Sequence, residues 1–395
     1  MPNTESAHTP DIYADIRPYG DADVAAVLQR LLRSPDLFAA LLRFRFPGKP
    51  AWYYRWLSPL LRWYLQRQAR SIQTVDDFQR WLAPLIAMLL ERSSQQIEVR
   101  GLEHLTPGTP YLFISNHRDI AMDPTLINYS LHRAGWPTSR IAIGDNLLSH
   151  PDVADIMRLN KSFVVKRSFA NNREKLRELQ KLSGYIRQSL DEGVSVWIAQ
   201  REGRAKDGVD ETDTAVLKML ALNGRERGED FTRTLTQMRP VPVCIQYEWD
   251  PCDVLKANEL VTLANNGRYD KAPGEDTRSI LLGMTGQKGR IIVDFGRPLA
   301  GVELSSADQM AQAIDQQLEL MREILPVQRT ALALLQRDFS GYEQYPGAEW
   351  HSEVATQLEQ RLQPLEAPVR QRLLQTYAMP LLVARPVSSA GSAVH

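Results

Sequence analysis

Seven short runs rich in β-branched and aromatic residues, separated by helix-like segments, constrain the fold of this chain most strongly. These runs lie at 97–101, 111–115, 140–144, 162–166, 194–199, 241–247 and 290–296. The clearest helical pattern between them extends from Asn172 to Leu190. Strands that alternate with helices in this way predict an α/β domain with a mostly parallel sheet flanked by helices.

Helical patterns also occupy both flanks of this predicted sheet. We expect four parts: a helical region over 1–94, the α/β domain over 95–300, a second helical region over 301–384 and a disordered tail over 385–395. In the second helical region, apolar spacing predicts helices over 310–324, 327–339 and 353–377. In the first, Asp76 or Asp77 is expected to cap a helix that ends near Leu90.

Composition excludes several classes of protein. The 395 residues carry 47 Lys+Arg and 47 Asp+Glu, so the basic excess typical of nucleic-acid-binding proteins is missing. Cys244 and Cys252 are too few for a disulfide framework and do not have a zinc-binding spacing, so we expect reduced thiols and no metal site. No secretory signal or run of ~18 apolar residues is visible, which predicts a cytoplasmic chain without a membrane span.

One N-terminal stretch is both basic and aromatic. Between Asp36 and Asp76 there are seven basic residues and no acidic one. On a helix over 52–68, the residues that share one face are Trp52, Trp56, Leu60 and Trp63, and those opposite are Arg55, Arg62 and Gln66. This pattern favours contact with an anionic membrane surface, although packing against a neighbouring domain explains it equally well, and Pro59 is expected to kink or restart the helix.

A histidine follows the second strand-like run directly. His117 lies two residues beyond Ser115, with Asp119 and Asp123 a short distance further on. A histidine whose Nδ1 is held by a carboxylate can act as a general base, and here the nucleophile would be a hydroxyl of the substrate. A lone histidine in this position is more often structural, and nucleophile-elbow, P-loop and dinucleotide-binding patterns are absent.

Three further unusual segments follow in the sequence. They are NKSFVVKRS at 160–168, VWIAQREGRAKDG at 196–208 and RPVPVCIQY at 239–247. The first two end strands with basic residues, and the carboxyl ends of parallel strands meet at one edge of a sheet. Arginines gathered there would bind phosphate, whereas each cluster taken singly is better explained by surface salt bridges.

Taken together, the four segments resemble the four motif blocks of the glycerolipid acyltransferases. SNHRDIAMDP resembles the first block, N-H-x-x-x-x-D-P, and SFVVKR resembles the second, an apolar strand that ends in arginine. QREGRAKDG resembles the third block, whose core is E-G-x-R, and VPVCIQY resembles the fourth, an apolar strand opened by proline. The resemblance covers residues 95–296.

The resemblance implies roles for individual residues. His117 would be the base, with Asp123 or Asp119 as its partner. The implied substrate-binding residues are Arg118, Lys166, Arg167, Glu202, Gly203, Arg204, Lys206 and Pro242. This chain departs from the family in having five residues rather than four between His117 and Asp123, which leaves Asp119 open as a second partner. The Asp-Pro pair at 123–124 matches the helix start of the family and favours Asp123. It also has Gln200 and Arg201 in place of the usual Phe-Pro lead of the third block.

The activity implied by the resemblance is acyl transfer without a cofactor. The donor would be acyl-CoA or acyl carrier protein, and the acceptor 1-acylglycerol-3-phosphate or glycerol-3-phosphate in phospholipid synthesis. The family resemblance and the aromatic stretch together predict a peripheral protein at the inner face of the cell membrane. Two alternatives remain at this stage, namely a non-catalytic lipid-binding protein on the same scaffold and an acyl thioesterase.

Overall fold

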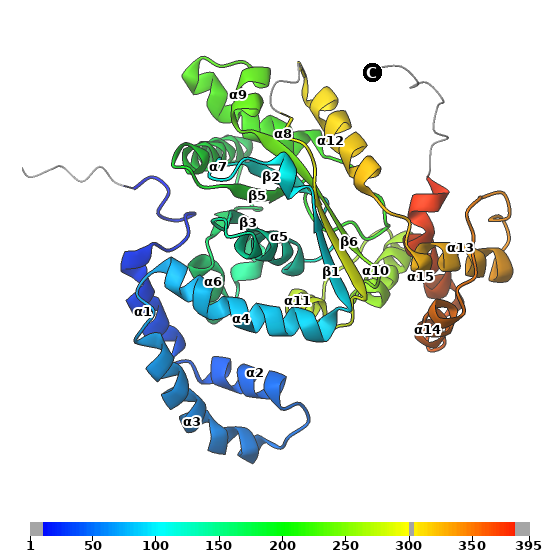
Figure 1. Ribbon diagram of the computed structural model, residues 1–395, viewed down its shortest axis with the longest axis horizontal. Helices are drawn as coiled ribbons and strands as arrows, with labels where there is room; N and C mark the ends of the chain where they lie inside the picture. The colour runs from blue at the N-terminus through cyan, green and yellow to red at the C-terminus, as the bar shows by residue number, and fades with distance from the viewer. Residues whose placement is uncertain (1–10, 300–303, 384–395) are drawn as a thin grey trace, which may run out of the picture.

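A seven-stranded sheet with helices on both faces forms the centre of the molecule (Figure 1). The computed structural model describes residues 11–299 and 304–383, so the tail expected over 385–395 lies outside the described residues. All seven predicted strands form. They are β1 (Gln96–Arg100), β2 (Leu112–Ser115), β3 (Arg140–Gly144), β4 (Ser162–Val165), β5 (Val196–Ala199), β6 (Pro240–Tyr247) and β7 (Arg290–Phe295).

The sheet order places β2 in the middle of the sheet. The order is β1-β7-β6-β2-β5-β3-β4, and every neighbouring pair is parallel except β6 and β7. The prediction of a mostly parallel sheet is therefore confirmed. Because β2, β3, β4 and β5 are parallel, the loops that follow their last residues all emerge at the same edge of the sheet.

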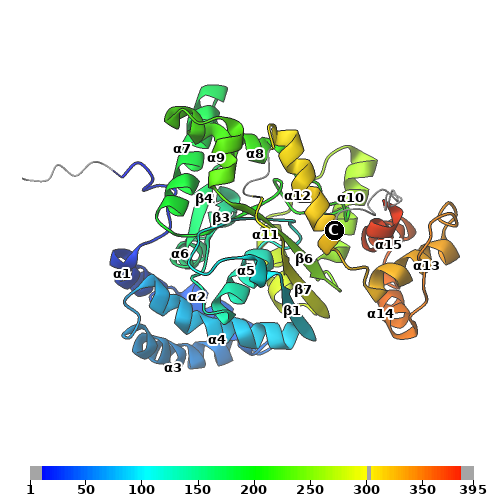
Figure 2. The same cartoon turned by 45° about the horizontal axis from the view of Figure 1, so that its top comes forward.

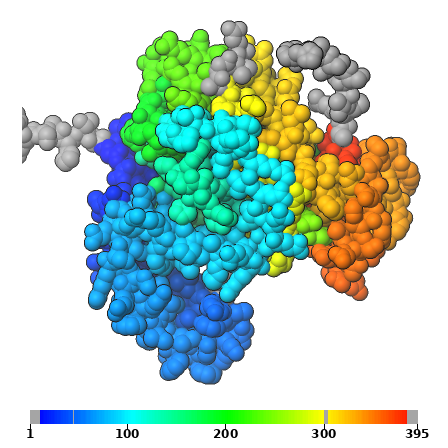
Figure 3. All heavy atoms as spheres, in the orientation of Figure 1, coloured from blue at the N-terminus to red at the C-terminus, as the bar shows by residue number. Residues whose placement is uncertain are grey.

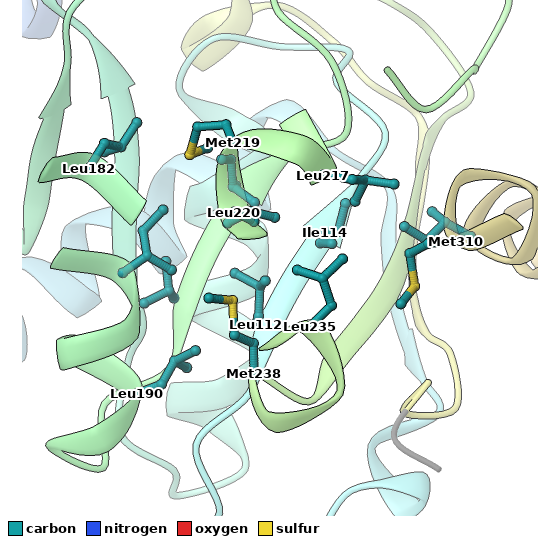
Figure 4. Close-up of a cluster of buried hydrophobic side chains, with 14 of the residues drawn as sticks. Leu112, Ile114, Leu182, Leu190, Leu217, Met219, Leu220, Leu235, Met238 and Met310 are labelled. Atoms are coloured by element: carbon teal, nitrogen blue, oxygen red, sulfur yellow. The ribbon is translucent and has the colours of Figure 1, made fainter. Parts of the chain in front are cut away.

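Helices cover the sheet on both sides because its side chains alternate between two apolar faces. Leu112 and Ile114 of β2 point toward one set of helices, as Figure 4 shows, and Phe113 points toward the other set. The elements around the sheet are α5 (Met122–Arg133), α6 (Pro151–Leu159), α7 (Asn172–Asp191), α8 (Thr214–Leu220), α9 (Phe231–Gln237), α10 (Asp253–Asn266), α11 (Glu275–Thr285), α12 (Ala307–Met321) and the 3₁₀ turns η1 (Leu102–His104), η2 (Asp145–Leu148) and η3 (Ala221–Arg227).

Within the described residues, four helices precede the sheet. They are α1 (Asp21–Leu31), α2 (Pro35–Arg45), α3 (Ala51–Ala69) and α4 (Val75–Ser93). Helices α2 and α3 project from the body of the molecule (Figures 1 and 3), and α3 continues through Pro59 as one helix. The cap expected at Asp76 or Asp77 lies at Thr74, whose Oγ1 accepts from the Asp77 N–H at 3.0 Å while the Asp77 carboxylate accepts from the Thr74 N–H.

The C-terminal helices pack mainly on one another beside α10 (Figure 2). They are α13 (Pro326–Asp338), α14 (Ser352–Leu362) and α15 (Ala367–Leu382). The single helix expected over 353–377 is therefore two helices. Pro364 and Pro368 explain the break, because a proline inside a helix removes a hydrogen bond and clashes with the preceding turn, whereas at the first turn of α15 Pro368 is tolerated.

We predict that Gly101→Ala destabilises the protein more than Gly108→Ala. Both glycines have positive φ, +76° and +78°, so each alanine should cost about 1–2 kcal/mol of unfolding free energy through backbone strain. At Gly101 the new Cβ would also lie 1.8 Å from the Phe295 carbonyl oxygen, whereas at Gly108 it meets nothing within 4 Å. Urea denaturation of both variants measures the difference, and equal losses would contradict the packing that links β1 to β7.

Candidate active site

The loop that follows β2 is fixed to β6 by Asn116. Strand β2 pairs with β6 as far as Ser115, which is opposite Val243. Beyond that point the backbone groups of Ile245 have no strand partner on this side, and the Asn116 side chain takes its place. Its Oδ1 accepts from the Ile245 N–H at 2.8 Å, and its Nδ2 donates to the Ile245 carbonyl at 3.0 Å. The start of the loop therefore has a defined position.

His117 follows immediately and is paired with Asp123. Its Nδ1 lies 2.9 Å from Oδ2 of Asp123, which is fully buried in the first turn of α5. Because the carboxylate can only accept, Nδ1 carries the proton and Nε2 is left as the basic nitrogen. The imidazole side chain is 13% exposed and packs against the Trp197 ring in a T-shaped arrangement, with centroids 6.0 Å apart. This geometry suits a general base.

Further hydrogen bonds hold the Asp123 carboxylate in place. Its Oδ2 accepts from the backbone N–H groups of Arg118 at 2.7 Å and Asp119 at 2.9 Å. Its Oδ1 accepts from the Tyr247 hydroxyl at 2.7 Å. Burial and the negative charge of Asp123 raise the pKa of Tyr247 well above its ordinary value, so this hydroxyl remains a donor. The orientation of Asp123, and through it that of His117, is fixed from two sides.

Asp119 forms no hydrogen bond or ion pair with His117. Its Oδ1 accepts from the N–H groups of Ala121 at 3.0 Å and Met122 at 2.8 Å, so it caps the start of α5. Burial, together with the charge of Asp123, raises the pKa of Asp119. Of the two carboxylates that the sequence left open, the structure brings Asp123 to the imidazole.

A cavity of about 360 Å³ lies in front of His117, at the edge of the sheet where β3, β4 and β5 end. Apolar side chains from these strands, α7 and α8 line part of it: Ile143, Val165, Leu179, Leu182, Ile198 and Met219. Six of the residues predicted to bind substrate also line it: Lys166, Arg167, Glu202, Gly203, Arg204 and Lys206. The cavity is therefore lined by His117, by a wall of cationic side chains and by a wall of apolar side chains.

The cations of this wall differ in how far their charges are already compensated. Lys166 pairs with Glu178 at 2.8 Å and with Asp15 at 3.2 Å, and Lys206 pairs with Glu259. These ion pairs lie within the protein, so neither lysine needs an external anion.

Arg204 has few partners of its own. Its Nη2 donates to Ser279 at 3.4 Å, whereas its buried Nη1 has no hydrogen-bond partner among the described residues. Arg167 lies 3.6 Å from Glu202, whose side chain is 72% exposed. A guanidinium nitrogen left unpaired out of water is costly, so Arg204 favours an anion in the cavity.

Two predicted substrate-binding residues lie outside this cavity. The Arg118 guanidinium donates to Asp210 at 2.6 Å and lines a separate cavity of about 60 Å³. Pro242 lies within the central strand β6, opposite Ile114, and its carbonyl accepts from the Gly296 N–H at 2.8 Å. The structure therefore gives both residues internal contacts and does not bring them to His117.

Sequence reasoning did not single out several residues that shape the site. Asn116 belongs to the first motif block and Tyr247 ends the fourth. The sequence signal that could have identified them was their position at the ends of predicted strands. Gly144 ends β3, and a Cβ there would lie 2.5 Å from Nε of Arg167, so the absence of a side chain makes room for that guanidinium. No group of three His, Cys, Asp or Glu side chains within residues 11–299 and 304–383 is placed to hold a metal ion.

Comparison with known proteins finds one family model that matches the segment with the first three motif blocks. Residues 96–220, from β1 to the end of α8, match the sequence model of the Acyltransferase family. A solved structure, the 1-acyl-sn-glycerophosphate (LPA) acyltransferase PlsC from Thermotoga maritima, aligns with a TM-score of 0.36 and 14% identity over 76% of this chain and 94% of that chain. No curated protein matches the chain in sequence.

We predict that both thiols are unreactive in the folded protein. Burial raises the pKa of Cys244 to about 12 and that of Cys252 to about 11, so the reactive thiolate is nearly absent at pH 8. Ellman's reagent at pH 8 should therefore label neither cysteine until the protein is unfolded, and both afterwards. Rapid labelling of the native protein would show that a thiolate is accessible and would reopen the question of a cysteine nucleophile.

Proposed function

We propose, from the premise that residues 96–220 form a domain of the glycerolipid acyltransferase superfamily, that this protein moves a fatty acyl group to a hydroxyl of a phosphate-bearing glycerolipid. The donor would be a thioester, acyl-CoA or acyl carrier protein, and the acceptor 1-acylglycerol-3-phosphate or glycerol-3-phosphate. The observation that carries this proposal is the cavity that His117 and Arg204 share, in which His117 supplies a base and Arg204 a guanidinium whose Nη1 has no hydrogen-bond partner among the described residues. Phospholipid synthesis is the process that such a reaction would serve.

The chemistry follows from the protonation state of His117. Its free Nε2 takes the proton of the acceptor hydroxyl as the oxygen attacks the thioester carbonyl carbon. The imidazolium that forms is stabilised by the Asp123 carboxylate at Nδ1. When the tetrahedral intermediate collapses, the carbon–sulfur bond breaks, and Nε2 returns the proton to the departing thiolate. No covalent enzyme intermediate is needed.

The walls of the cavity suit the two ends of the proposed substrates. Arginine binds phosphate through two parallel N–H groups, and Arg204 offers a nitrogen with no other partner among the described residues. Arg167 adds a second guanidinium beside it in the same cavity. The apolar wall offers the acyl chain a surface away from water, so that the thioester carbonyl can approach His117.

We predict that His117→Ala lowers kcat by about 10²–10⁴-fold, the usual contribution of a general base, and leaves the fold intact. Asp123→Asn should cause a similar loss, because an amide no longer selects the tautomer in which Nδ1 carries the proton. Asp119→Asn is the matched control, since an asparagine oxygen can still cap α5. Turnover of a labelled long-chain thioester measures all three variants, and a larger loss in Asp119→Asn would assign the partner role to Asp119.

The same assay separates the proposed function from its alternatives. Chromatography of the labelled products distinguishes an acylated glycerolipid from free fatty acid. A product that is only fatty acid would indicate a thioesterase. Lipid binding without turnover, unaffected by His117→Ala, would indicate a non-catalytic scaffold.

We further propose that α3 docks the protein on an anionic membrane surface, at the inner face of the cell membrane. The side chains of Trp52, Trp56, Leu60 and Trp63 are between 58% and 73% exposed, although they are large and apolar. Exposed Arg55, Arg67 and Arg70 lie on the same helix or at its end, and no acidic residue occurs between Asp36 and Asp76. Arg62 instead packs its guanidinium over the Phe38 ring of α2, at 5.1 Å.

Indole rings prefer the headgroup boundary, and arginines attract anionic lipids, so this helix fits a bilayer surface better than another protein domain. Among the described residues, none forms a helix that is both long and apolar enough to cross a membrane.

We predict that replacing Trp52, Trp56 and Trp63 together by serine weakens binding to phosphatidylglycerol-containing vesicles by at least about tenfold, because three apolar contacts are lost. The control is Trp350→Ser, which removes a tryptophan that is 48% exposed on the C-terminal side of the molecule. Vesicle sedimentation at low and high salt measures the effect. Unchanged binding of the triple variant would show that α3 is not the docking surface.

A further inference from the structure

The loop between β2 and α5, residues 116–121, carries His117 and is called the catalytic loop below. Two of its consecutive peptide groups donate hydrogen bonds to the same oxygen atom. The N–H groups of Arg118 and Asp119 both donate to Oδ2 of Asp123, the same oxygen that accepts from His117. In a planar trans peptide the carbonyl points opposite to the N–H group. The carbonyl oxygens of His117 and Arg118 therefore point away from Asp123 and need partners elsewhere.

Each of these two carbonyls has a partner, so each peptide plane is held at both ends. The His117 carbonyl accepts from the backbone N–H of Ala205 at 2.7 Å, in the loop that also carries Arg204. The Arg118 carbonyl accepts from Nζ of Lys256 at 2.7 Å. Lys256 lies on α10, beyond the residues that match the acyltransferase family.

Lys256 is an unusual residue for this position because its side chain is almost completely buried, with 2% exposure. A buried ammonium is costly unless it is paired and hydrogen-bonded. Its ion pair with Asp250, at 2.5 Å, meets the first requirement, and its contact with the Arg118 carbonyl adds a hydrogen bond to the catalytic loop. It does not line the cavity in front of His117.

The C-terminal helices hold the segment that carries Lys256. The Tyr377 hydroxyl of α15 accepts from the Asp250 N–H at 3.0 Å and donates to Asp253 at 2.8 Å. Arg361 of α14 pairs with the same Asp253 carboxylate at 2.5 Å. Asp253 is the first residue of α10, one turn before Lys256. A continuous set of contacts thus extends from α14 and α15 to the peptide that follows Arg118.

We propose that Lys256 is a positioning residue for His117, and that α14 and α15 keep it in place through Asp250 and Asp253. The effect on turnover rests on the proposed acyl transfer, whereas the effect on the geometry of His117 does not. Without the ammonium, the peptide between Arg118 and Asp119 is free to rotate, and Asp123 loses one of its donors. The imidazole then loses its alignment with the acceptor hydroxyl, whereas the side chains that line the cavity lose no direct hydrogen bond or ion pair with Lys256.

The first test compares Lys256→Met with Lys288→Met. Lys288 is also fully buried, and its Nζ donates to the Gly286 carbonyl at 2.9 Å rather than to the catalytic loop. At a temperature where both variants are folded by circular dichroism, Lys256→Met should lower kcat by about 10- to 100-fold, the size expected for a small misplacement of a reacting group. KM for the acceptor should change less than about twofold, and Lys288→Met should keep the kcat of the wild type.

The second test does not depend on activity. In protein labelled with ¹⁵N-histidine, the hydrogen-bonded Nδ1 proton of His117, identified by its loss in His117→Ala, should shift or broaden in Lys256→Met and remain in Lys288→Met. Tyr377→Phe should give a smaller change in the same direction, and it replaces Lys256→Met if that variant does not fold. An unchanged resonance together with unchanged kcat would overturn the positioning role. A change in the resonance in a protein without acyl transfer would refute the proposed function and leave the positioning role standing.

Discussion

The carboxylate of Asp123 organises the centre of this molecule. It is fully buried, and a charge in that position is stable only when donors surround it. Four donors converge on it, and they come from two separate parts of the structure. The loop after β2 supplies the His117 imidazole and two peptide N–H groups, and the end of β6 supplies the Tyr247 hydroxyl. The hydrogen bonds that stabilise this buried carboxylate thereby also fix the position of His117, its tautomer and the loop that carries it.

The parallel sheet explains how distant segments meet around that charge. The carboxyl ends of β2, β4 and β5 lie at one edge, so His117, Arg167 and Arg204 reach the same cavity although they are far apart in the sequence. Two backbone hydrogen bonds join the first and third of these loops, from Gln200 to Ser115 and from Ala205 to His117. His117 and Arg204 are thus on loops that are bonded directly to each other.

Much of the fold could be predicted from the sequence because local patterns determine it. Each of the seven strands forms where β-branched residues cluster between turns, and α7 extends only one residue beyond its prediction. The incorrect predictions also concerned local features, namely a helix break and a helix cap. A helix continuing past Pro364 was expected, and the α4 cap was placed on an aspartate rather than on Thr74, which is bonded reciprocally to Asp77.

The site was less predictable because it depends on contacts between segments distant in sequence. The spacing of residues left both Asp119 and Asp123 open, with the Asp-Pro pair at 123–124 favouring Asp123, and the backbone distinguishes them by turning Asp119 toward the N–H groups of Ala121 and Met122 at the start of α5. Arg118 stands next to His117 in the sequence, but its side chain leaves the loop on the other side and meets Asp210. The contribution of Tyr247 follows from the pairing of β6 with β2, which no local pattern reveals.

Phosphate binding by Arg204 is tested most directly by comparing two acceptors that differ only in a phosphate. With one labelled long-chain thioester, kcat/KM is determined for 1-acylglycerol-3-phosphate and for 1-acylglycerol, in the wild type and in Arg204→Met. The wild type should prefer the phosphorylated acceptor by at least about 100-fold, since Nη1 of Arg204 has no hydrogen-bond partner among the described residues without it, and Arg204→Met should lose most of this preference. Equal values of kcat/KM for the two acceptors in the wild type would contradict phosphate binding by Arg204.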